Sequence, residues 1–161
     1  MARTKHDYML AWATLVHVGT FLPSALSQYL HDELGISLAE QDLLKQLSVA
    51  GGRLKLVELS RRIFLSKAGV TKMIDRLETN GLVVRQRSKS DRRVIYAELG
   101  EAGREVLKES QQLLGAWVKA NLSDHLSDKQ LRDLLNALRS VLEGHGRWND
   151  QLAHLRGEAT G

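Results

Sequence analysis

The sequence of 161 residues contains no cysteine. The chain therefore forms no disulfide and no thiolate metal site, and it cannot sense oxidants through a thiol. We find no apolar run that approaches the roughly 20 residues needed to span a bilayer. The N-terminus carries Arg3, Lys5 and Asp7 and lacks the apolar stretch of a signal peptide. We expect a cytoplasmic protein with no membrane partner.

Sequence motifs of common enzymes and metal sites are missing as well. There is no HExxH, no GxSxG, no P-loop and no GxGxxG. The histidines are widely separated along the chain, at His6, His17, His31, His125, His145 and His154. We therefore expect no enzymatic activity, no metal ion and no cofactor.

Positive charge is concentrated in the middle of the sequence. Residues 53–93 hold 12 Lys and Arg against four Asp and Glu, so this segment is +8 while the whole chain is +4. The flanks together are therefore −4. A confined positive field points to a polyanionic partner. The alternative is a solvated charged face that serves only solubility.

Apolar residues at helical spacing predict long helices at both ends of the chain. The first extends from Asp7 to about Leu34, and Pro23 is expected to kink or restart it. Near the other end, Ser127 and Gln130 form a capping-box pattern that opens the last helix. These helices are more apolar than a small domain needs, so we expect a helical dimerisation region formed by residues 1–35 and 101–161.

The middle of the chain, residues 36–100, follows a helix–helix–hairpin order. A capping box at Ser37 begins one helix, and a short strand at 54–56 precedes the next. Ser66 is expected to cap a further helix, which Gly81 ends. Two β-rich runs then surround a polar tip, residues 87–93, which predicts a hairpin with a basic tip.

This order is typical of a DNA-binding helix-turn-helix with a wing. An apolar stripe (Val70, Met73, Ile74, Leu77) would anchor the capped helix and leave its other face free. We expect Lys67, Thr71 and Lys72 to read the major groove, while Ala68 and Gly69 let the backbone approach it.

Arginines on a thin hairpin can enter a minor groove, where a narrow width concentrates negative potential. We expect Arg92 and Arg93 to act in this way. Asp91 can hold a guanidinium by paired hydrogen bonds, or favour the turn through its own side chain, and both roles can coexist.

The central residues resemble the MarR family of winged helix-turn-helix regulators. The resemblance rests on Leu-Ser-Arg-Arg-Ile in the first helix, Ser66–Arg76, Asn80-Gly81-Leu82-Val83, Ser90-Asp91-Arg92-Arg93 and Leu99-Gly100-Glu101-Ala102-Gly103. The sequence departs from many relatives at Gly100, where a capping hydroxyl is missing, which predicts a looser junction.

The resemblance implies a mainly α (α+β) fold and a homodimer with terminal dimerisation helices. It implies a cytoplasmic transcriptional regulator that represses transcription and binds a pseudo-palindromic site in double-stranded DNA. It also implies that a small aromatic or phenolic effector releases the protein from DNA. The candidate DNA-contacting residues are Arg62, Ser66, Lys67, Ala68, Gly69, Thr71, Lys72, Arg76, Arg87, Lys89, Asp91, Arg92 and Arg93.

Three residues of the first helix are candidates for binding such an effector. Tyr8 and Trp12 can stack on an aromatic ring, and His17 can hydrogen-bond it. Plain packing in the core or at an interface is the competing interpretation.

Two other functions fit the same residues. One is an effector-independent architectural DNA-binding protein, and the other is a winged-helix module whose basic surface binds an acidic protein.

Overall fold

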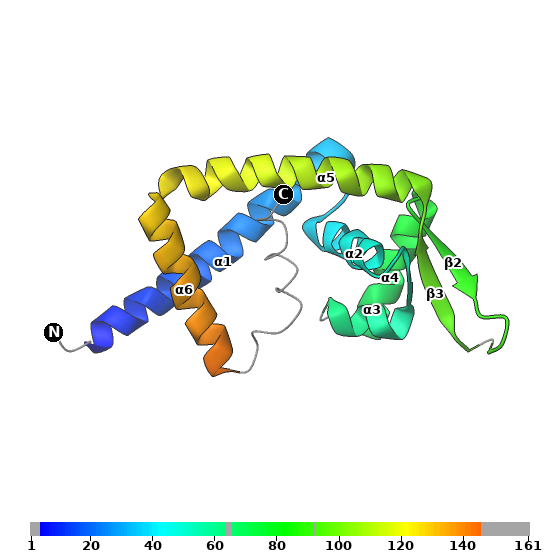
Figure 1. Ribbon diagram of the computed structural model, residues 1–161, viewed down its shortest axis with the longest axis horizontal. Coiled ribbons are helices and arrows are strands. Elements are labelled where there is room, and N and C mark those ends of the chain that lie inside the picture. The colour runs from blue at the N-terminus through cyan, green and yellow to red at the C-terminus, as the bar shows by residue number, and fades with distance from the viewer. Residues whose placement is uncertain (1–3, 64–65, 92, 146–161) are drawn as a thin grey trace. The chain divides into compact units, whose positions relative to one another are not determined.

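The computed structural model describes residues 4–63, 66–91 and 93–145, and it describes the backbone but not the side chain of Lys67. The described chain is mainly helical with one small sheet, which confirms the predicted fold class (Figure 1). The elements in chain order are α1 (Lys5–Leu34), α2 (Leu38–Val49), β1 (Arg53–Lys55), α3 (Leu56–Arg62), α4 (Lys67–Thr79), β2 (Val83–Arg87), β3 (Ile95–Leu99), α5 (Glu101–Asn121), the 3-10 turn η1 (Ser123–His125) and α6 (Asp128–Gly144).

Side-chain caps begin the helices where the sequence predicts them. Ser37 accepts a hydrogen bond from the Glu40 amide, and the Glu40 carboxylate accepts one from the Ser37 amide at 2.7 Å. The same reciprocal box opens α6 at Ser127. A further box joins Thr4 to Asp7, and hydrogen bonds from the Thr4 backbone and hydroxyl lower the pKa of Asp7. Local sequence therefore fixes these boundaries.

Helix α1 passes through Pro23 without restarting, so that part of the prediction is wrong. Proline removes one amide donor and leaves the carbonyl four residues earlier, at Gly19, without its usual partner. Both residues are exposed, so water can satisfy that carbonyl. An exposed proline therefore costs this helix one hydrogen bond and does not end it.

The sheet has the strand order β1–β3–β2, and all neighbours are antiparallel. Leu54 pairs with Ala97, and Arg85 pairs with Ala97 from the other side. Leu54 and Ala97 are buried against the helices, whereas the alternate positions Arg53 and Gln86 face solvent. The hairpin β2–β3 extends away from the helices (Figure 1) and forms the wing.

The core lies among α2, α3, α4 and the inner face of the sheet. Its fully buried members are leucine, isoleucine and valine side chains at Ile36, Leu43, Leu44, Leu47, Leu59, Val70, Ile74, Leu77 and Val83. Burial of each such side chain contributes roughly 1.5–3 kcal/mol before entropy is counted. This core holds α4 and the wing in a fixed relation.

The junction between the wing and α5 is tight, so the prediction of a looser junction is wrong. A Cβ on Gly103 would overlap the carbonyl oxygen of Leu82 and come within 2.9 Å of the Leu99 side chain. At Gly100 a Cβ would lie 3.1 Å from the carbonyl of Gly81. Glycine at both positions lets the start of α5 approach the backbone of Gly81 and Leu82, just before β2.

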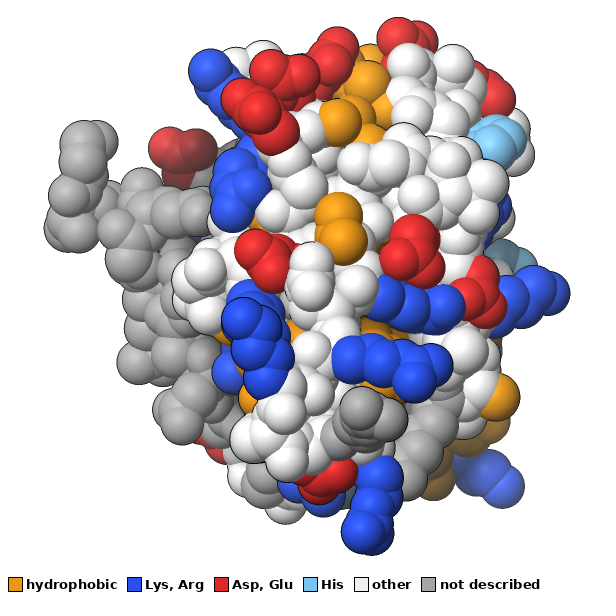
Figure 2. Space-filling model, turned by 90° about the vertical axis from the view of Figure 1, so that its right-hand side faces the viewer, with side chains coloured by type: hydrophobic (Ala, Val, Ile, Leu, Met, Phe, Trp, Pro, Cys, Tyr) orange, Lys and Arg blue, Asp and Glu red, His pale blue; other side chains and the backbone are white. Residues whose placement is uncertain are grey.

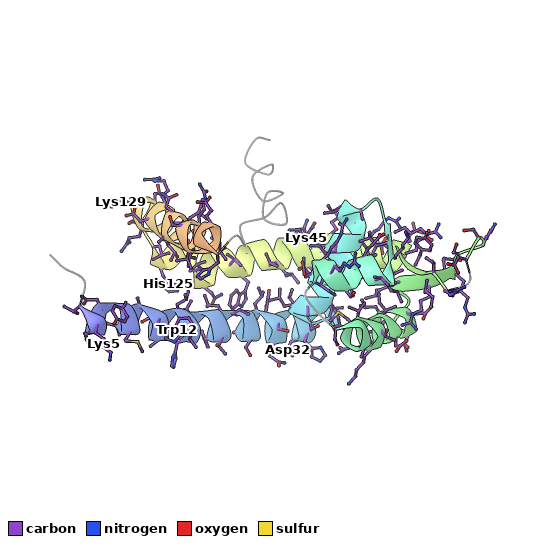
Figure 3. The ribbon with its side chains drawn as sticks, turned by 90° about the horizontal axis from the view of Figure 1, so that it is seen from below. Lys5, Trp12, Asp32, Lys45, His125 and Lys129 are labelled. Atoms are coloured by element: carbon purple, nitrogen blue, oxygen red, sulfur yellow. The ribbon has the colours of Figure 1, made fainter. Side chains whose placement is uncertain are left out.

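The chain divides into two compact units. The first ends at Trp117 and the second begins at Val118. Each unit carries an exposed apolar helix. On α1, Trp12 is 62% and Phe21 67% exposed (Figure 3 labels Trp12). On α6, five apolar side chains at helical spacing are exposed: Leu131, Leu134, Leu135, Leu138 and Val141.

Helix α1 is long and apolar enough, by length and composition alone, to cross a membrane, since an 18-residue stretch of it has a mean hydropathy of 1.4. The expectation that no apolar segment is long enough to span a bilayer is therefore wrong. Small and neutral polar residues such as Thr14 and Ser24 interrupt the apolar run, but no Asp, Glu, Lys or Arg lies between Tyr8 and His31. A buried core helix of a soluble protein passes the same test, but only 6% of this stretch is buried.

Candidate nucleic-acid interface

Helix α4 has one buried face and one free face. Val70, Ile74 and Leu77 are at most 1% exposed and anchor it in the core. Thr71 and Lys72, which are predicted to read the major groove, are exposed, as are Asp75 and Ala68, where the backbone is predicted to approach DNA. The structure therefore brings the candidate base-reading residues together on a single exposed surface of α4.

The start of α4 is fixed by its cap. The Ser66 hydroxyl accepts a hydrogen bond from the Gly69 amide at 3.1 Å, as the sequence predicts. The Ser66 hydroxyl proton is not used by this cap and can be donated to a phosphate. Gly69 is half-buried, and the predicted Lys67 side chain lies outside the described residues.

The wing tip is closed by short-range hydrogen bonds. The Ser88 amide donates to the Val94 carbonyl, and the Val94 amide donates to the Asp91 carbonyl, both at 2.9 Å. The Asp91 carboxylate accepts from the Arg93 amide at 3.0 Å and lies 3.9 Å from Arg93 Nε. Asp91 thus stabilises the turn, as predicted, but its carboxylate is too far from Arg93 Nε for the predicted paired hydrogen bonds with that guanidinium. Arg92 lies outside the described residues.

Arg93, in the described part of the tip, has a side chain that is 96% exposed. Arg87 and Lys89 are exposed as well. Figure 2 shows Lys and Arg side chains distributed over the side of the molecule that carries the wing, with Asp and Glu side chains among them. The field of this surface is therefore positive but not uniform.

Arg85 on β2 links the wing to α4, a role that sequence reasoning missed. Its Nη2 donates to the Thr71 carbonyl at 2.9 Å, and its Nη1 pairs with the Asp75 carboxylate. Its amide donates to Glu78 Oε1 at 3.1 Å. One arginine therefore fixes the strand to the free side of α4. The available signal was its inward strand position, where an unpaired charge would be costly.

Arg76 is on α4 but is directed at the corner between α1 and α2. Its Nη2 donates to the Gly35 carbonyl at 3.1 Å, and its Nε lies 3.3 Å from the nearly buried Glu40 carboxylate. Gly35 ends α1 in a left-handed conformation, with φ of 69°. Arg76, predicted as a DNA contact, thus braces α4 against the end of α1. Arg62, also predicted as a DNA contact, is half-buried at the end of α3.

A shallow hollow of about 250 Å³ lies beside the free face of α4. Apolar side chains, including Leu56, Val57 and Ile95, line most of it, and Lys55, Thr71, Arg93 and Val94 complete the wall. The predicted effector residues Tyr8, Trp12 and His17 are all exposed on α1 and do not line this hollow. Among the described residues, no three His, Asp or Glu side chains gather to hold a metal ion.

Known proteins resemble this region in both sequence and arrangement. The MarR family model matches residues 36–95. The structure also matches the crystal structure of AbsC, a MarR family transcriptional regulator from Streptomyces coelicolor, over 98% of this chain and 99% of AbsC, with a TM-score of 0.75 and 28% identity.

Residues 36–95 match the MarR family model, and the fold of the chain is that of MarR family transcriptional regulators. A second structural relative is Sco3205, a MarR family transcriptional regulator from Streptomyces coelicolor solved in complex with DNA. The two chains are 27% identical, and the match covers 89% of this chain and 91% of Sco3205 with a TM-score of 0.78. These homologues and this fold are those of transcriptional regulators, not of enzymes.

Among curated proteins, the uncharacterized HTH-type transcriptional regulator YkoM of Bacillus subtilis is 37% identical over 75 residues. That match spans 47% of this chain and 48% of YkoM, so the chain covers about half the length of this relative. The similarity to MarR family proteins therefore lies in the winged-helix region and in the fold.

Proposed function

We propose that the chain is a sequence-specific transcriptional regulator that binds double-stranded DNA. The observation that carries the proposal is the joint exposure of Thr71 and Lys72 on α4 and of Arg93 on the wing, with Arg85 bonded between the two elements. A helix anchored in this way can enter a major groove while the tip contacts the adjacent minor groove. The relative Sco3205, which is solved in complex with DNA, supports DNA as the partner.

We propose that the regulator acts as a homodimer, with residues 1–35 and 101–161 as the dimerisation region and 36–100 as the DNA-binding domain. The exposed apolar residues of α1 and α6 support this, since a second copy would remove them from water. A twofold dimer presents two α4 helices, so the site is an inverted repeat with half-site centres roughly 10 bp apart. Such pairing also accounts for the apolar α1 in a cytoplasmic protein without membrane attachment.

Selection of binding sites from random duplexes tests both proposals. We expect a motif with dyad symmetry, held about a thousandfold or more tighter than bulk duplex DNA. Equal competition by bulk DNA would favour the architectural DNA-binding alternative. Absence of any duplex affinity would favour the protein-interaction module instead.

We further propose that the regulator represses transcription and that a small aromatic or phenolic acid releases it. The hollow beside α4 supports this class of ligand, because its apolar wall suits a ring and Lys55 and Arg93 stand at its edge to meet a carboxylate. A ligand there would compete with DNA for Thr71 and Arg93. A reporter gene under the selected operator tests the sign of regulation, and titration with salicylate or benzoate tests release.

A further inference from the structure

The wing has a second surface, on the side of the sheet opposite the core. Side chains alternate across a strand, so the partners Tyr96 and Gln86 share this side, as do Arg53 and Glu98. Buried Leu54 and Ala97 point to the other side. We call the surface formed by Arg53, Gln86, Tyr96 and Glu98, with Lys89 at the tip, the outer wing face. Arg87 is the strand partner of Ile95 and so leaves the edge strand on the opposite side, but it borders the hollow on this surface.

Arg53 is held on this surface by an aromatic ring. Its guanidinium carbon lies 4.1 Å from the centroid of the Tyr96 ring. Glu98 is its direct cross-strand partner, yet no ion pair joins these two residues. Stacking on a ring fixes the plane of a guanidinium and leaves its N–H donors free along the edge. Arg53 is therefore oriented to bind an anion in the plane of that edge.

The outer wing face encloses an open hollow of about 540 Å³. Three cations, Arg53, Arg87 and Lys89, stand around it with a single carboxylate, Glu98, and the hydroxyls of Ser88 and Ser90 lie at its tip end. Among the described residues, no acidic side chain is ion-paired with any of these cations. Separated cations and hydroxyls along an open surface suit a chain of phosphates better than one small anion.

The position of this surface determines which phosphates it can reach. The opposite side of the hairpin carries Arg85, which bonds to Thr71, and Ile95, which lines the hollow beside α4. That inner side faces the DNA that α4 reads. The outer wing face is directed away from α4, so it reaches duplex beyond the half-site.

We propose that the outer wing face binds the sugar-phosphate backbone of DNA that flanks the operator, with Arg53 as its central contact. The proposal rests on the function proposed above. It implies that the DNA length required for full affinity exceeds the symmetric motif, because flanking phosphates contribute without regard to their sequence.

Two duplexes that carry the same selected operator test the proposal, one that ends at the edges of the half-sites and one with about eight further base pairs on each side. We expect Arg53→Ala to weaken binding of the long duplex roughly fivefold to tenfold and to reduce its salt slope by about one per protomer. Its affinity for the short duplex should equal that of the parent. Arg93→Ala, on the tip, should weaken both duplexes.

A gain-of-function variant guards against a folding defect in Arg53→Ala. Gln86→Arg adds a cation to the same surface and should tighten binding of the long duplex only. Equal effects of either variant on both duplexes, or no effect on the long one, would overturn the flanking contact while leaving operator recognition intact. Failure of the parent protein to bind either duplex would instead refute the proposed function.

Discussion

Arg85 on the wing strand donates a hydrogen bond to the main-chain carbonyl of Thr71, 2.9 Å away on α4. The same guanidinium pairs with Asp75 one turn further along the helix. Thr71 is the residue expected to contact a base edge, so its backbone is positioned by a residue of the wing. Reading of the major groove and placement of the tip are therefore connected through one side chain.

Arg85→Lys should weaken operator binding about tenfold, because an ammonium cannot bond both the Thr71 carbonyl and Asp75 in the geometry of a planar guanidinium. The loss of stability should be small, on the order of 1 kcal/mol, since Asp75 is exposed and the ion pair is screened. Fluorescence anisotropy with labelled operator and urea unfolding measure the two quantities. Parental affinity in Arg85→Lys would show that the link does not position α4.

Arg93→Ala should lower affinity for every duplex and flatten the dependence of affinity on salt by about one unit per protomer. The side chain is 96% exposed and bonds only within the tip, so the melting temperature should not change. Lys108→Ala on exposed α5 is the matched control and should leave both affinity and slope at parental values. A salt titration in which Arg93→Ala and the parent coincide contradicts a role for the tip.

Thr71→Ala should relax sequence choice, with a loss of roughly 1–3 kcal/mol of discrimination at one base pair in each half-site. The salt slope should stay constant because no charge is removed. Thr71→Ser retains the hydroxyl and is the control. Competition between operators that differ at single positions measures the effect, and unchanged discrimination at every position would exclude Thr71 from base reading.

Gly103→Ala should destabilise the protein by about 2 kcal/mol, since the added methyl group would overlap the Leu82 carbonyl in a packed junction. Gly115→Ala, in the same helix, has no atom within 4 Å of the added Cβ and should stabilise it by up to about 1 kcal/mol. Urea unfolding of the two variants should move in opposite directions. A neutral Gly103→Ala would mean that α5 shifts away from β2 at no cost.

The double substitution Leu134→Glu, Leu138→Glu should convert the dimer to monomers, because two charges would enter the apolar stripe of α6. Operator affinity should then fall at least a hundredfold, as each half-site would be bound separately. Asn136→Glu, on the same exposed helix, is the charge control. Analytical ultracentrifugation at micromolar concentration decides the matter: a parent protein that is already monomeric would refute the dimer.

The sequence predicts those parts of the fold that depend on near neighbours. The caps at Ser37, Ser66 and Ser127 depend on residues three positions away, and each occurs as predicted. Arg85 was missed because its partners Thr71 and Asp75 lie 14 and 10 residues away and meet it only after β2 packs beside α4.

Errors arose where the surroundings of a residue decide its effect. Pro23 is tolerated because it is exposed, and Gly100 makes a tight junction because of the backbone that lies next to it. The uncharged stretch of α1 was overlooked because neutral polar residues divide it. The roles assigned to Tyr8, Trp12 and His17 stay predictions, since they depend on what covers α1.

The bracing of α4 on two sides, by Arg85 toward the wing and by Arg76 toward the end of α1, limits how this protein can acquire new targets. A protomer braced in this way carries its groove-reading parts as one block with a set internal spacing. In the proposed dimer on DNA, operators whose half-sites are stretched or compressed internally are therefore out of reach, and a change of spacing can be accommodated only where the two protomers meet.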